Sequence, residues 1–253
     1  MMTSYQNAGK NFLHYTRYEF AVSSDQMMGY PSPPLEMPFS GERIPLPLPD
    51  DAAPSPLLLT EAIEERSSVR EYSSSPLTLA ELSFLLWCTQ GVKWISPYRI
   101  STFRTVPSAG ARHPIETFLQ INNVKNVEPG IYRYCALDHA LGVVNQSSES
   151  AEMVFRGSLQ QGFIRDAAVV FLWVADSYRT TWRYGERGFR SLFLDAGHIC
   201  QNLYLAAQAV GCGTCAVNAF DDDLLNSLLD VDGEKTFLIY MSAVGKIIPE
   251  WTR

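Results

Sequence analysis

One stretch, residues 189–210, restricts the possible folds more than any other part of this sequence. Its apolar side chains recur mostly at steps of three and four over about six helical turns, and Gly211 ends the pattern. The apolar positions are Phe189, Leu192, Phe193, Ala196, Ile199, Cys200, Leu203, Ala206, Ala207 and Val210. A helix this long and apolar must bury one face, so the pattern predicts packing on a sheet or on a second subunit.

The periodicity elsewhere predicts several strands. Residues 167–175 form an unbroken apolar run, which is typical of a central strand buried on both faces. Residues 115–121 alternate between two faces, and residues 236–244 form a last strand. Segments 130–135 and 141–144 are expected to pair as a hairpin.

Helical patterns separate these strands. Residues 57–65, 149–160 and 221–229 each predict a short helix. Another helix begins at the capping box Thr78-Leu-Ala-Glu81 and stops at Gly91. Because helices interleave with hairpins, the predicted class is α+β, with a mixed and mostly antiparallel sheet between helices, in a domain of residues 57–253.

Residues 1–56 are expected to form an extended N-terminal arm. They hold nine of the fifteen prolines, and the runs at 31–34 and 45–49 cannot continue a helix or a central strand. Large apolar side chains argue against a disordered leader. These are Tyr15, Tyr18, Phe20, Met27, Met28, Tyr30 and Phe39. We therefore expect the arm to pack on the body of the chain or on a partner subunit.

Composition and charge oppose several classes of function. The 253 residues are 46% apolar and 19% charged, which are ordinary globular values. A net charge of −7 and a pI near 5.1 oppose binding to nucleic acid or to anionic lipid. The first residues lack a basic region followed by an apolar core, and no run is long enough to span a bilayer. A cytoplasmic location without membrane contact is expected.

The cysteines and histidines do not predict a site. Five cysteines are an odd number in a chain too long to need disulfides, so reduced thiols are expected. Cys212-Gly-Thr-Cys215 follows the negative end of the long predicted helix, which disfavours a reactive thiolate. The four histidines are scattered, so no metal is predicted. The sequence also lacks Gly-x-Ser-x-Gly and dinucleotide-binding motifs.

Two other motifs could bind a ligand. Pro107-Ser-Ala-Gly-Ala-Arg-His-Pro-Ile-Glu116 predicts a tight loop that leads into a strand. Small residues between prolines let backbone N–H groups approach a flat or anionic ligand, although an ordinary turn is the alternative. Arg66-Ser-Ser-Val-Arg70 clusters guanidinium and hydroxyl groups that suit a phosphate. A surface turn is again the alternative.

Four motifs in sequence order resemble those of the nitroreductase superfamily, and its SagB-type dehydrogenases in particular. They are Arg66-Ser-Ser-Val-Arg70, Pro107-Ser-Ala-Gly110, Tyr184-Gly-Glu-Arg-Gly-Phe-Arg190 and Gly211-Cys-Gly-Thr214. The resemblance spans residues 57–246, and the order of the motifs makes it more specific than any single motif. It implies a nitroreductase-like fold, an FMN cofactor and a homodimer with FMN at the two-fold interface.

The resemblance also implies roles for individual residues. Arg66, Ser67, Ser68 and Arg70 would bind the phosphate or ribityl chain, with Lys246 as a second phosphate cation. Pro107, Ser108, Ala109 and Gly110 would line the flavin ring, and Gly211, Gly213 and Thr214 would approach its other edge. His113 would contact the flavin or stabilise the loop by a hydrogen bond. Lys246 could instead be a solvated surface charge. NAD(P)H, if it is the electron donor, would dock over the flavin.

The pair Arg183-Tyr184 bears on substrate chemistry. Azoline-oxidising SagB-type enzymes carry a Lys-Tyr pair that resembles this position and is thought to abstract a proton. Arg183 remains protonated at physiological pH, so it cannot act as a general base, although it can stabilise a developing anion. Heterocycle oxidation is therefore in doubt. Alternatively, both residues pack at the entry to the long helix, at a subunit interface.

We therefore expect an FMN-dependent oxidoreductase that transfers hydride through flavin N5. One possible reaction is dehydrogenation of a thiazoline, an oxazoline or a related peptide-derived substrate. Another is NAD(P)H-driven reduction of nitroaromatics or quinones. A third alternative is a flavin-binding, non-catalytic subunit whose arm docks on a biosynthetic complex. The sequence leaves the physiological substrate open.

Overall fold

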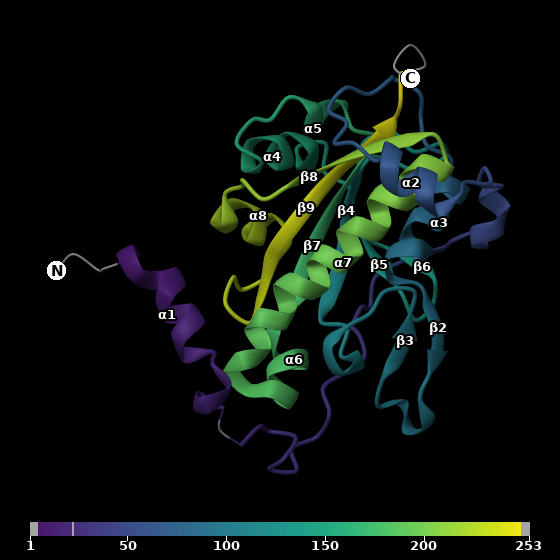
Figure 1. Cartoon of the computed structure of the whole chain (residues 1–253). Helices are drawn as coiled ribbons and strands as arrows, with labels where there is room; N and C mark the ends of the chain where they lie inside the picture. Colours follow the sequence, from purple (N-terminus) through teal and green to yellow (C-terminus); the bar gives the residue numbers. More distant parts are fainter. Residues whose placement is uncertain (1–4, 22, 249–253) are drawn as a thin grey trace.

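The computed structural model describes residues 5–21 and 23–248, and its centre is a seven-stranded sheet (Figure 1). The strand order is β1-β6-β5-β4-β7-β9-β8. These strands are β1 Arg43–Pro45, β4 Ile115–Ile121, β5 Gly130–Cys135, β6 Ala140–Asn145, β7 Val169–Asp176, β8 Cys212–Val217 and β9 Thr236–Lys246. A separate two-stranded hairpin pairs β2 (Val92–Ile95) with β3 (Thr102–Arg104).

Neighbouring strands of the large sheet run antiparallel in each described pair. Parallel pairing occurs in isolated bridges, such as that of Ser68 with Thr214. The predicted α+β class with a mostly antiparallel sheet is confirmed. β7 lies between β4 and β9, and its residues 169–175 are all buried, as the unbroken apolar run predicted.

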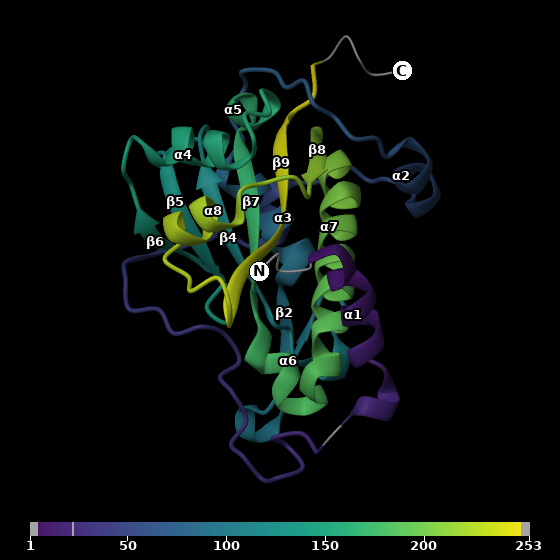
Figure 2. The ribbon, with the colours of Figure 1, turned by 90° about the vertical axis from the view of Figure 1, so that its left-hand side faces the viewer.

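Helices cover both faces of the sheet (Figure 2). One face carries α3 (Leu79–Gln90) and α7 (Gly188–Ala209), and the other carries α4 (Ser150–Gly157), α5 (Phe163–Asp166) and α8 (Asp222–Leu228). The other α-helices are α1 (Ala8–Tyr15), α2 (Leu59–Glu65) and α6 (Ser177–Tyr184), which leads into α7. Single 3-10 turns lie at 5–7, 18–20, 49–52, 97–99, 109–111 and 185–187.

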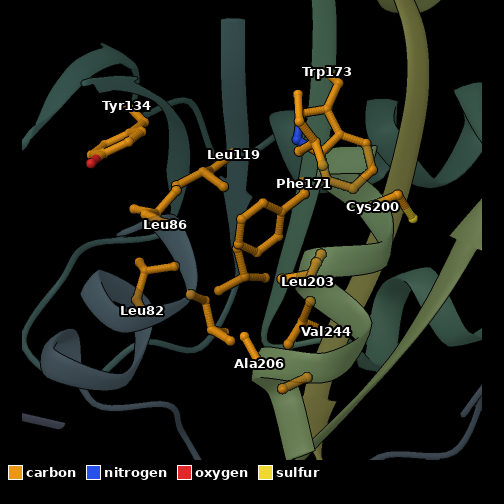
Figure 3. Packing of buried hydrophobic residues seen from close by; sticks show 14 of the residues in the cluster. Leu82, Leu86, Leu119, Tyr134, Phe171, Trp173, Cys200, Leu203, Ala206 and Val244 are labelled. Atoms are coloured by element: carbon orange, nitrogen blue, oxygen red, sulfur yellow. The ribbon is translucent and has the colours of Figure 1, made fainter. Parts of the chain in front are cut away.

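The core between the sheet and the α3–α7 layer consists of large apolar side chains (Figure 3). Leu82 and Leu86 of α3, Leu203 of α7, and Phe171 and Trp173 of β7 are all 0% exposed. Burial of one leucine or phenylalanine side chain contributes about 1.5–3 kcal/mol. The predicted packing of the long helix on a sheet is therefore confirmed.

Local signals set the ends of the helices on this face. Glu81 N donates to Thr78 Oγ1 at 3.1 Å, and Thr78 N donates to Glu81 Oε2 at 2.8 Å. The predicted capping box is confirmed, and α3 ends just before Gly91. Gly211 follows α7 with a φ of +62°, a conformation that glycine adopts without a steric penalty.

The N-terminal arm is extended only in part. Residues 31–42 form no helix or strand, in agreement with their prolines. The prediction of an extended arm missed α1, whose eight residues include no proline. Arg179 Nη1 donates to Leu35 O at 3.1 Å, and Arg133 Nη1 donates to Pro38 O at 3.0 Å. These contacts hold residues 31–42 on the body of the same chain.

Candidate functional site

The loop that follows Pro107 is tied to α7 by a buried carboxylate. Ser108 Oγ donates to Asp195 Oδ2 at 2.6 Å, and Ala109 N donates to Asp195 Oδ1 at 3.3 Å. Ser108 Oγ also accepts from His113 N at 2.8 Å. Burial raises the pKa of Asp195, which is only 3% exposed. The sequence offered one signal for this role, an acidic residue on the apolar side of a long helix.

Gly110 brings this loop against Arg183 and Tyr184. Its φ is +61°, and a Cβ built on it would lie 2.5 Å from Tyr184 Oη and 2.8 Å from Arg183 Cδ. The Arg183 guanidinium carbon lies 5.7 Å from the centroid of the Tyr184 ring. The structure thus places the predicted ring-lining residues and the predicted catalytic pair side by side.

His113 makes contacts within the loop. It is 5% exposed, and its carbonyl oxygen accepts from Arg179 Nη1 at 2.9 Å. Burial lowers the pKa of His113 to about 3, with a further contribution from the Arg104 guanidinium group, so its imidazole is neutral at neutral pH. These contacts are made by the His113 backbone, so the role of its imidazole, at the flavin or in the loop, stays a prediction.

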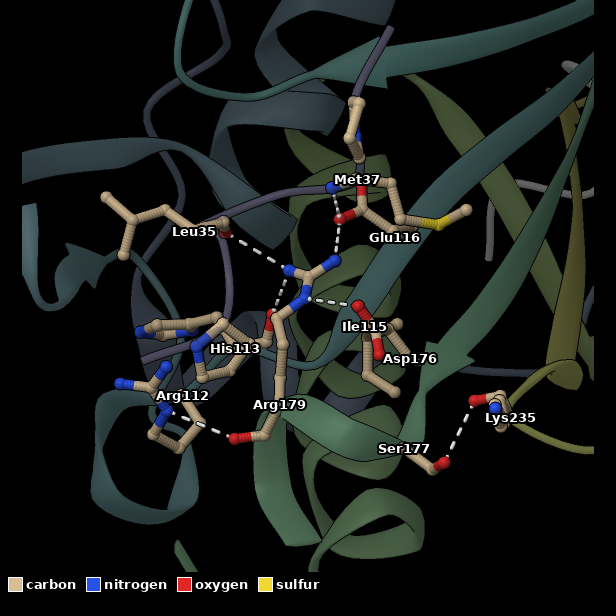
Figure 4. Close-up of polar contacts among 12 residues, drawn as sticks. Leu35, Met37, Arg112, His113, Ile115, Glu116, Asp176, Ser177, Arg179 and Lys235 are labelled. Carbon is tan, nitrogen blue, oxygen red and sulfur yellow. Dashed lines mark hydrogen bonds and ion pairs between the residues drawn. The ribbon is translucent and has the colours of Figure 1, made fainter. Parts of the chain in front are cut away.

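Behind the loop lies a cluster of buried charges (Figure 4). Arg179 is 0% exposed and pairs with Glu116 and with Asp176 Oδ2, the latter at 3.0 Å. Arg112 Nε donates to Arg179 O at 3.1 Å. Burial alone would raise the pKa of Glu116, but the nearby guanidinium groups hold it below its ordinary value. Because unpaired buried charges are costly, the cluster fixes the loop relative to β4 and α6.

The predicted phosphate-binding residues lie near the C-terminal half of α7. Ser68 Oγ lies 3.0 Å from Tyr204 Oη, and the Arg66 guanidinium carbon lies 5.3 Å from the centroid of the same ring. Arg66 is half-buried, whereas Ser67, Ser68 and Arg70 are exposed. Within residues 5–21 and 23–248, neither Arg66 nor Arg70 pairs with a carboxylate. Their donors can therefore receive an anion.

Two predicted glycines and Thr214 lie beside this basic segment. Val69 N donates to Thr214 O at 3.0 Å, and a Cβ on Gly213 would lie 2.6 Å from Val69 Cβ. Gly211 is exposed, and a Cβ there would meet nothing within 4 Å. Thr214 is 1% exposed, and its hydroxyl donates to Ala243 O at 2.8 Å. The Thr214 hydroxyl is therefore already bonded inside the protein.

Lys246 ends β9 in the same region. Its Nζ atom lies 2.6 Å from Glu81 Oε1 and donates to Val210 O at 2.7 Å. The ammonium group therefore has a carboxylate partner and also binds a carbonyl at the end of α7. A ligand phosphate would compete with Glu81 for this cation.

The predicted site residues fall into two groups within one chain. The ring group comprises residues 107–113 with Arg183 and Tyr184, and the phosphate group comprises residues 66–70, 211–214 and Lys246. Val210 lies 15 residues after Asp195, which corresponds to about 22 Å along a helix axis. Tyr204 lies nine residues after Asp195, so their side chains leave α7 about 180° apart. A single chain does not bring the two groups together.

The remaining chemical candidates are weak. Burial raises the pKa of the Cys212 thiol to about 12 and also raises that of Cys215, which disfavours a thiolate. In the described ranges, no three His, Cys, Asp or Glu side chains are placed to hold a metal ion. Nor does any helix within them combine the length and apolarity needed to cross a membrane.

Comparison of the sequence with known proteins identifies its relatives. The protein-family model described as "Nitroreductase family" matches residues 63–246. The Methanocaldococcus jannaschii nitroreductase-family protein MJ1384 is 38% identical over 190 residues, which cover 75% of this chain and 91% of that protein. The trifolitoxin-processing protein TfxB of Rhizobium leguminosarum is 29% identical over 133 residues, which cover 51% of this chain but only 36% of TfxB.

Solved structures share the fold. A nitroreductase-family structure from Anabaena variabilis has a TM-score of 0.65 at 27% identity and covers 82% of this chain, which spans only 42% of that one. A chain of the E. coli microcin synthetase McbBCD, with truncated pro-MccB17 bound, has a TM-score of 0.59 at 20% identity. The match covers 77% of this chain and 75% of that one. The NADPH:FMN oxidoreductase of Vibrio harveyi, complexed with NAD+, has a TM-score of 0.52 at 14% identity. The match covers 74% of this chain and 67% of that one.

Proposed function

This chain belongs to the nitroreductase family of oxidoreductases, and we propose that it uses FMN at a site formed between two copies of the chain. The observation that carries this proposal is the division of the candidate site. One group offers guanidinium and hydroxyl donors, the other offers a rigid loop with small residues, and they lie on different sides of α7.

The donor set suits a flavin mononucleotide. Arg66 and Arg70, with the hydroxyls of Ser67 and Ser68, would hold the phosphate and ribityl chain. Pro107, Ser108, Ala109 and Gly110 would lie against the ring, with Gly211, Gly213 and the Thr214 backbone at its other edge. Lys246 would bind the phosphate only if its ammonium group contacted the phosphate and the Glu81 carboxylate together. When bound, FMN would supply the centre that accepts and donates hydride.

A homodimer would complete the site. A second copy related by a two-fold axis would bring the ring group of one chain to the phosphate group of the other. Each site would then hold one FMN, and the pair would hold two. The long α7, which separates the groups within a chain, would lie at the contact between chains.

Arg183 and Tyr184 are the residues that we propose for substrate chemistry. Both contact the ring-lining loop at Gly110, so they would face the reacting part of a substrate. The Tyr184 hydroxyl would hold or move a proton, and Arg183 would stabilise a developing negative charge. Arg183 would not serve as the base, because a guanidinium group offers hydrogen-bond donors and no acceptor.

We favour a peptide-derived substrate, on which the protein would act as a SagB-type dehydrogenase. TfxB takes part in trifolitoxin processing, and the McbBCD synthetase was solved with a truncated pro-peptide bound. NAD(P)H-driven reduction of nitro compounds or quinones is the second candidate, because the Vibrio harveyi neighbour is an NADPH:FMN oxidoreductase complexed with NAD+. A non-catalytic flavin-binding subunit, the third alternative, would show no turnover of peptide-derived substrates and none of nitro compounds or quinones.

Cofactor analysis and turnover assays test the proposal. The purified protein should be yellow, should release FMN with little FAD on denaturation, and should sediment as a dimer with two flavins. Rates with thiazoline or oxazoline peptides, compared with rates for NAD(P)H and nitroaromatics or quinones, would then separate the two enzyme candidates. Colourless protein that fails to take up FMN would overturn the cofactor assignment.

A further inference from the structure

Helix α1 leaves two of its large apolar side chains, Leu13 and Tyr15, exposed. It is eight residues long, and none of them is buried. Leu13 is 57% exposed and Tyr15 is 62% exposed, and the following turn leaves Tyr18 80% exposed. An isolated helix this short is unstable in water, so α1 needs packing contacts to persist.

The contacts of α1 with its own chain are concentrated at its C-terminal end. Arg190 donates to Thr16 Oγ1 at 2.7 Å and to Leu13 O at 2.6 Å, and Arg187 donates to Thr16 O at 2.8 Å. Phe12 meets Phe193 edge to face, with ring centroids 6.2 Å apart. In Figure 1, the N-terminal end of α1 points away from α7. The body thus anchors α1 through Phe12 and the backbone near Thr16, and it leaves Leu13 and Tyr15 exposed.

The adjoining face of α7 is also apolar and exposed. Phe193 is 56% exposed and Leu194 is 63% exposed. Gly197, one turn further along, is exposed, and a Cβ there would meet nothing within 4 Å. Leu13 and Tyr15 of α1, with Phe193 and Leu194 of α7, are exposed on two helices that meet at the Phe12–Phe193 contact, and they are here called the α1–α7 surface. Exposed apolar patches of this kind mark interaction sites.

A second copy of the chain is the occupant that this surface fits best. The candidate flavin site is divided between two sides of α7, so its completion requires another copy near this helix. The apolar side chains carry no charge that would repel an identical surface, and Gly197 lets a second helix approach closely. We propose that α1 clasps the partner in the dimer and that the α1–α7 surface is part of the two-fold contact.

This inference rests on the proposed homodimer, but it adds a part that the family match does not contain. The family model begins at residue 63, whereas α1 ends at Tyr15. The clasp is therefore a feature of this chain outside the matched region. It also gives the N-terminal arm a role beyond packing on its own body.

Sedimentation equilibrium of Leu13→Glu tests the clasp. Because Leu13 is more than half exposed, a glutamate there should leave the fold intact, which circular dichroism and the melting temperature would check. The dimer dissociation constant should rise about 10- to 100-fold, which corresponds to about 1.4–2.8 kcal/mol and is typical of an interface position that matters. The matched control is Leu159→Glu, at a leucine that is 58% exposed beyond α4, and it should keep the parental constant.

Two further measurements separate the possible failures. If Phe193→Glu weakens the dimer while Leu13→Glu does not, the clasp by α1 is wrong and the proposed dimer stands. If the parent is monomeric with FMN bound, both ideas are wrong. Hydrogen exchange provides a readout without substitution, because α1 amides should gain protection as protein concentration rises through the monomer–dimer transition. Protection independent of concentration would overturn the clasp.

Discussion

Ser108 Oγ lies 2.6 Å from Asp195 Oδ2, so a side chain of α7 holds the loop that would line the flavin ring. The same hydroxyl accepts from His113 N at 2.8 Å. Ser108 therefore has both a donor and an acceptor role inside the protein. The shape of the loop is set before any ligand binds, and the helix that sets it is the one that we place at the dimer contact.

Asp195→Asn should change how stability depends on pH. Burial raises the pKa of Asp195 above its ordinary 3.8, so the folded chain binds this proton more readily than the unfolded chain does. The free energy of unfolding of the parent should therefore fall as pH rises from about 4 through the raised folded-state pKa. An asparagine has no proton to lose, so the stability of the variant should not fall in this way. Its melting temperature should therefore vary less with pH than that of the parent. Equal pH slopes for parent and variant would contradict the role of Asp195, and the exposed Asp223→Asn is the control.

Gly110→Ala should damage the ring-lining loop. The new Cβ would lie 2.5 Å from Tyr184 Oη at a φ of +61°, so both sterics and backbone conformation oppose it. The left-handed backbone alone costs about 1–2 kcal/mol. Urea unfolding should show at least that loss, together with weaker FMN binding. Gly162→Ala, at a φ of −54° with nothing within 4 Å, should have little effect, and equal behaviour of the two variants would argue against a tight loop.

Local patterns predicted much of the fold, because caps and periodicity depend on nearby residues. The capping box of Thr78 and Glu81 and the buried strand β7 were both evident from the sequence. The pairing of Arg179 with Glu116 was not, since it joins residues 63 positions apart. An arginine in a short helix usually indicates a solvated face, yet Arg179 is 0% exposed.

The candidate site was predictable as a list of residues but not as an arrangement. Motif order identified both the loop at Pro107 and the basic segment at Arg66. Their separation by α7 depends on how the helix is placed on the sheet, which no local pattern encodes. The contact of Lys246 with Glu81 was hidden for the same reason, because it joins the last strand to a helix near the start of the domain.

Arg66→Ala should weaken FMN binding without destabilising the fold. Arg66 is half-buried and has no carboxylate partner among the described residues, so removing it leaves no buried charge unpaired. A hydrogen bond to a charged group is worth about 1.5–3 kcal/mol, and the FMN dissociation constant should rise accordingly. Fluorescence titration of apoprotein measures this constant. Arg156→Ala, at an exposed position on α4, should bind FMN like the parent, and equal affinity in both variants would remove Arg66 from the phosphate site.

Tyr184→Phe separates chemistry from packing at the ring-lining loop. The substitution keeps the ring and removes only the hydroxyl, so FMN binding and the flavin spectrum should persist. If the hydroxyl assists proton transfer, turnover should fall by roughly 10²–10⁴-fold.

Arg183→Lys provides the complementary test, because a lysine can lose its proton where an arginine cannot. If Arg183 blocks azoline oxidation, the lysine variant should gain or increase that activity while the dimer remains intact. Steady-state rates with azoline peptides and with NAD(P)H-linked acceptors would measure both variants. Tyr184→Phe turnover within about twofold of the parent on every substrate corresponds to less than about half a kcal/mol of activation free energy. That result would make Tyr184 a packing residue, and proton transfer would then have to come from the substrate or from solvent.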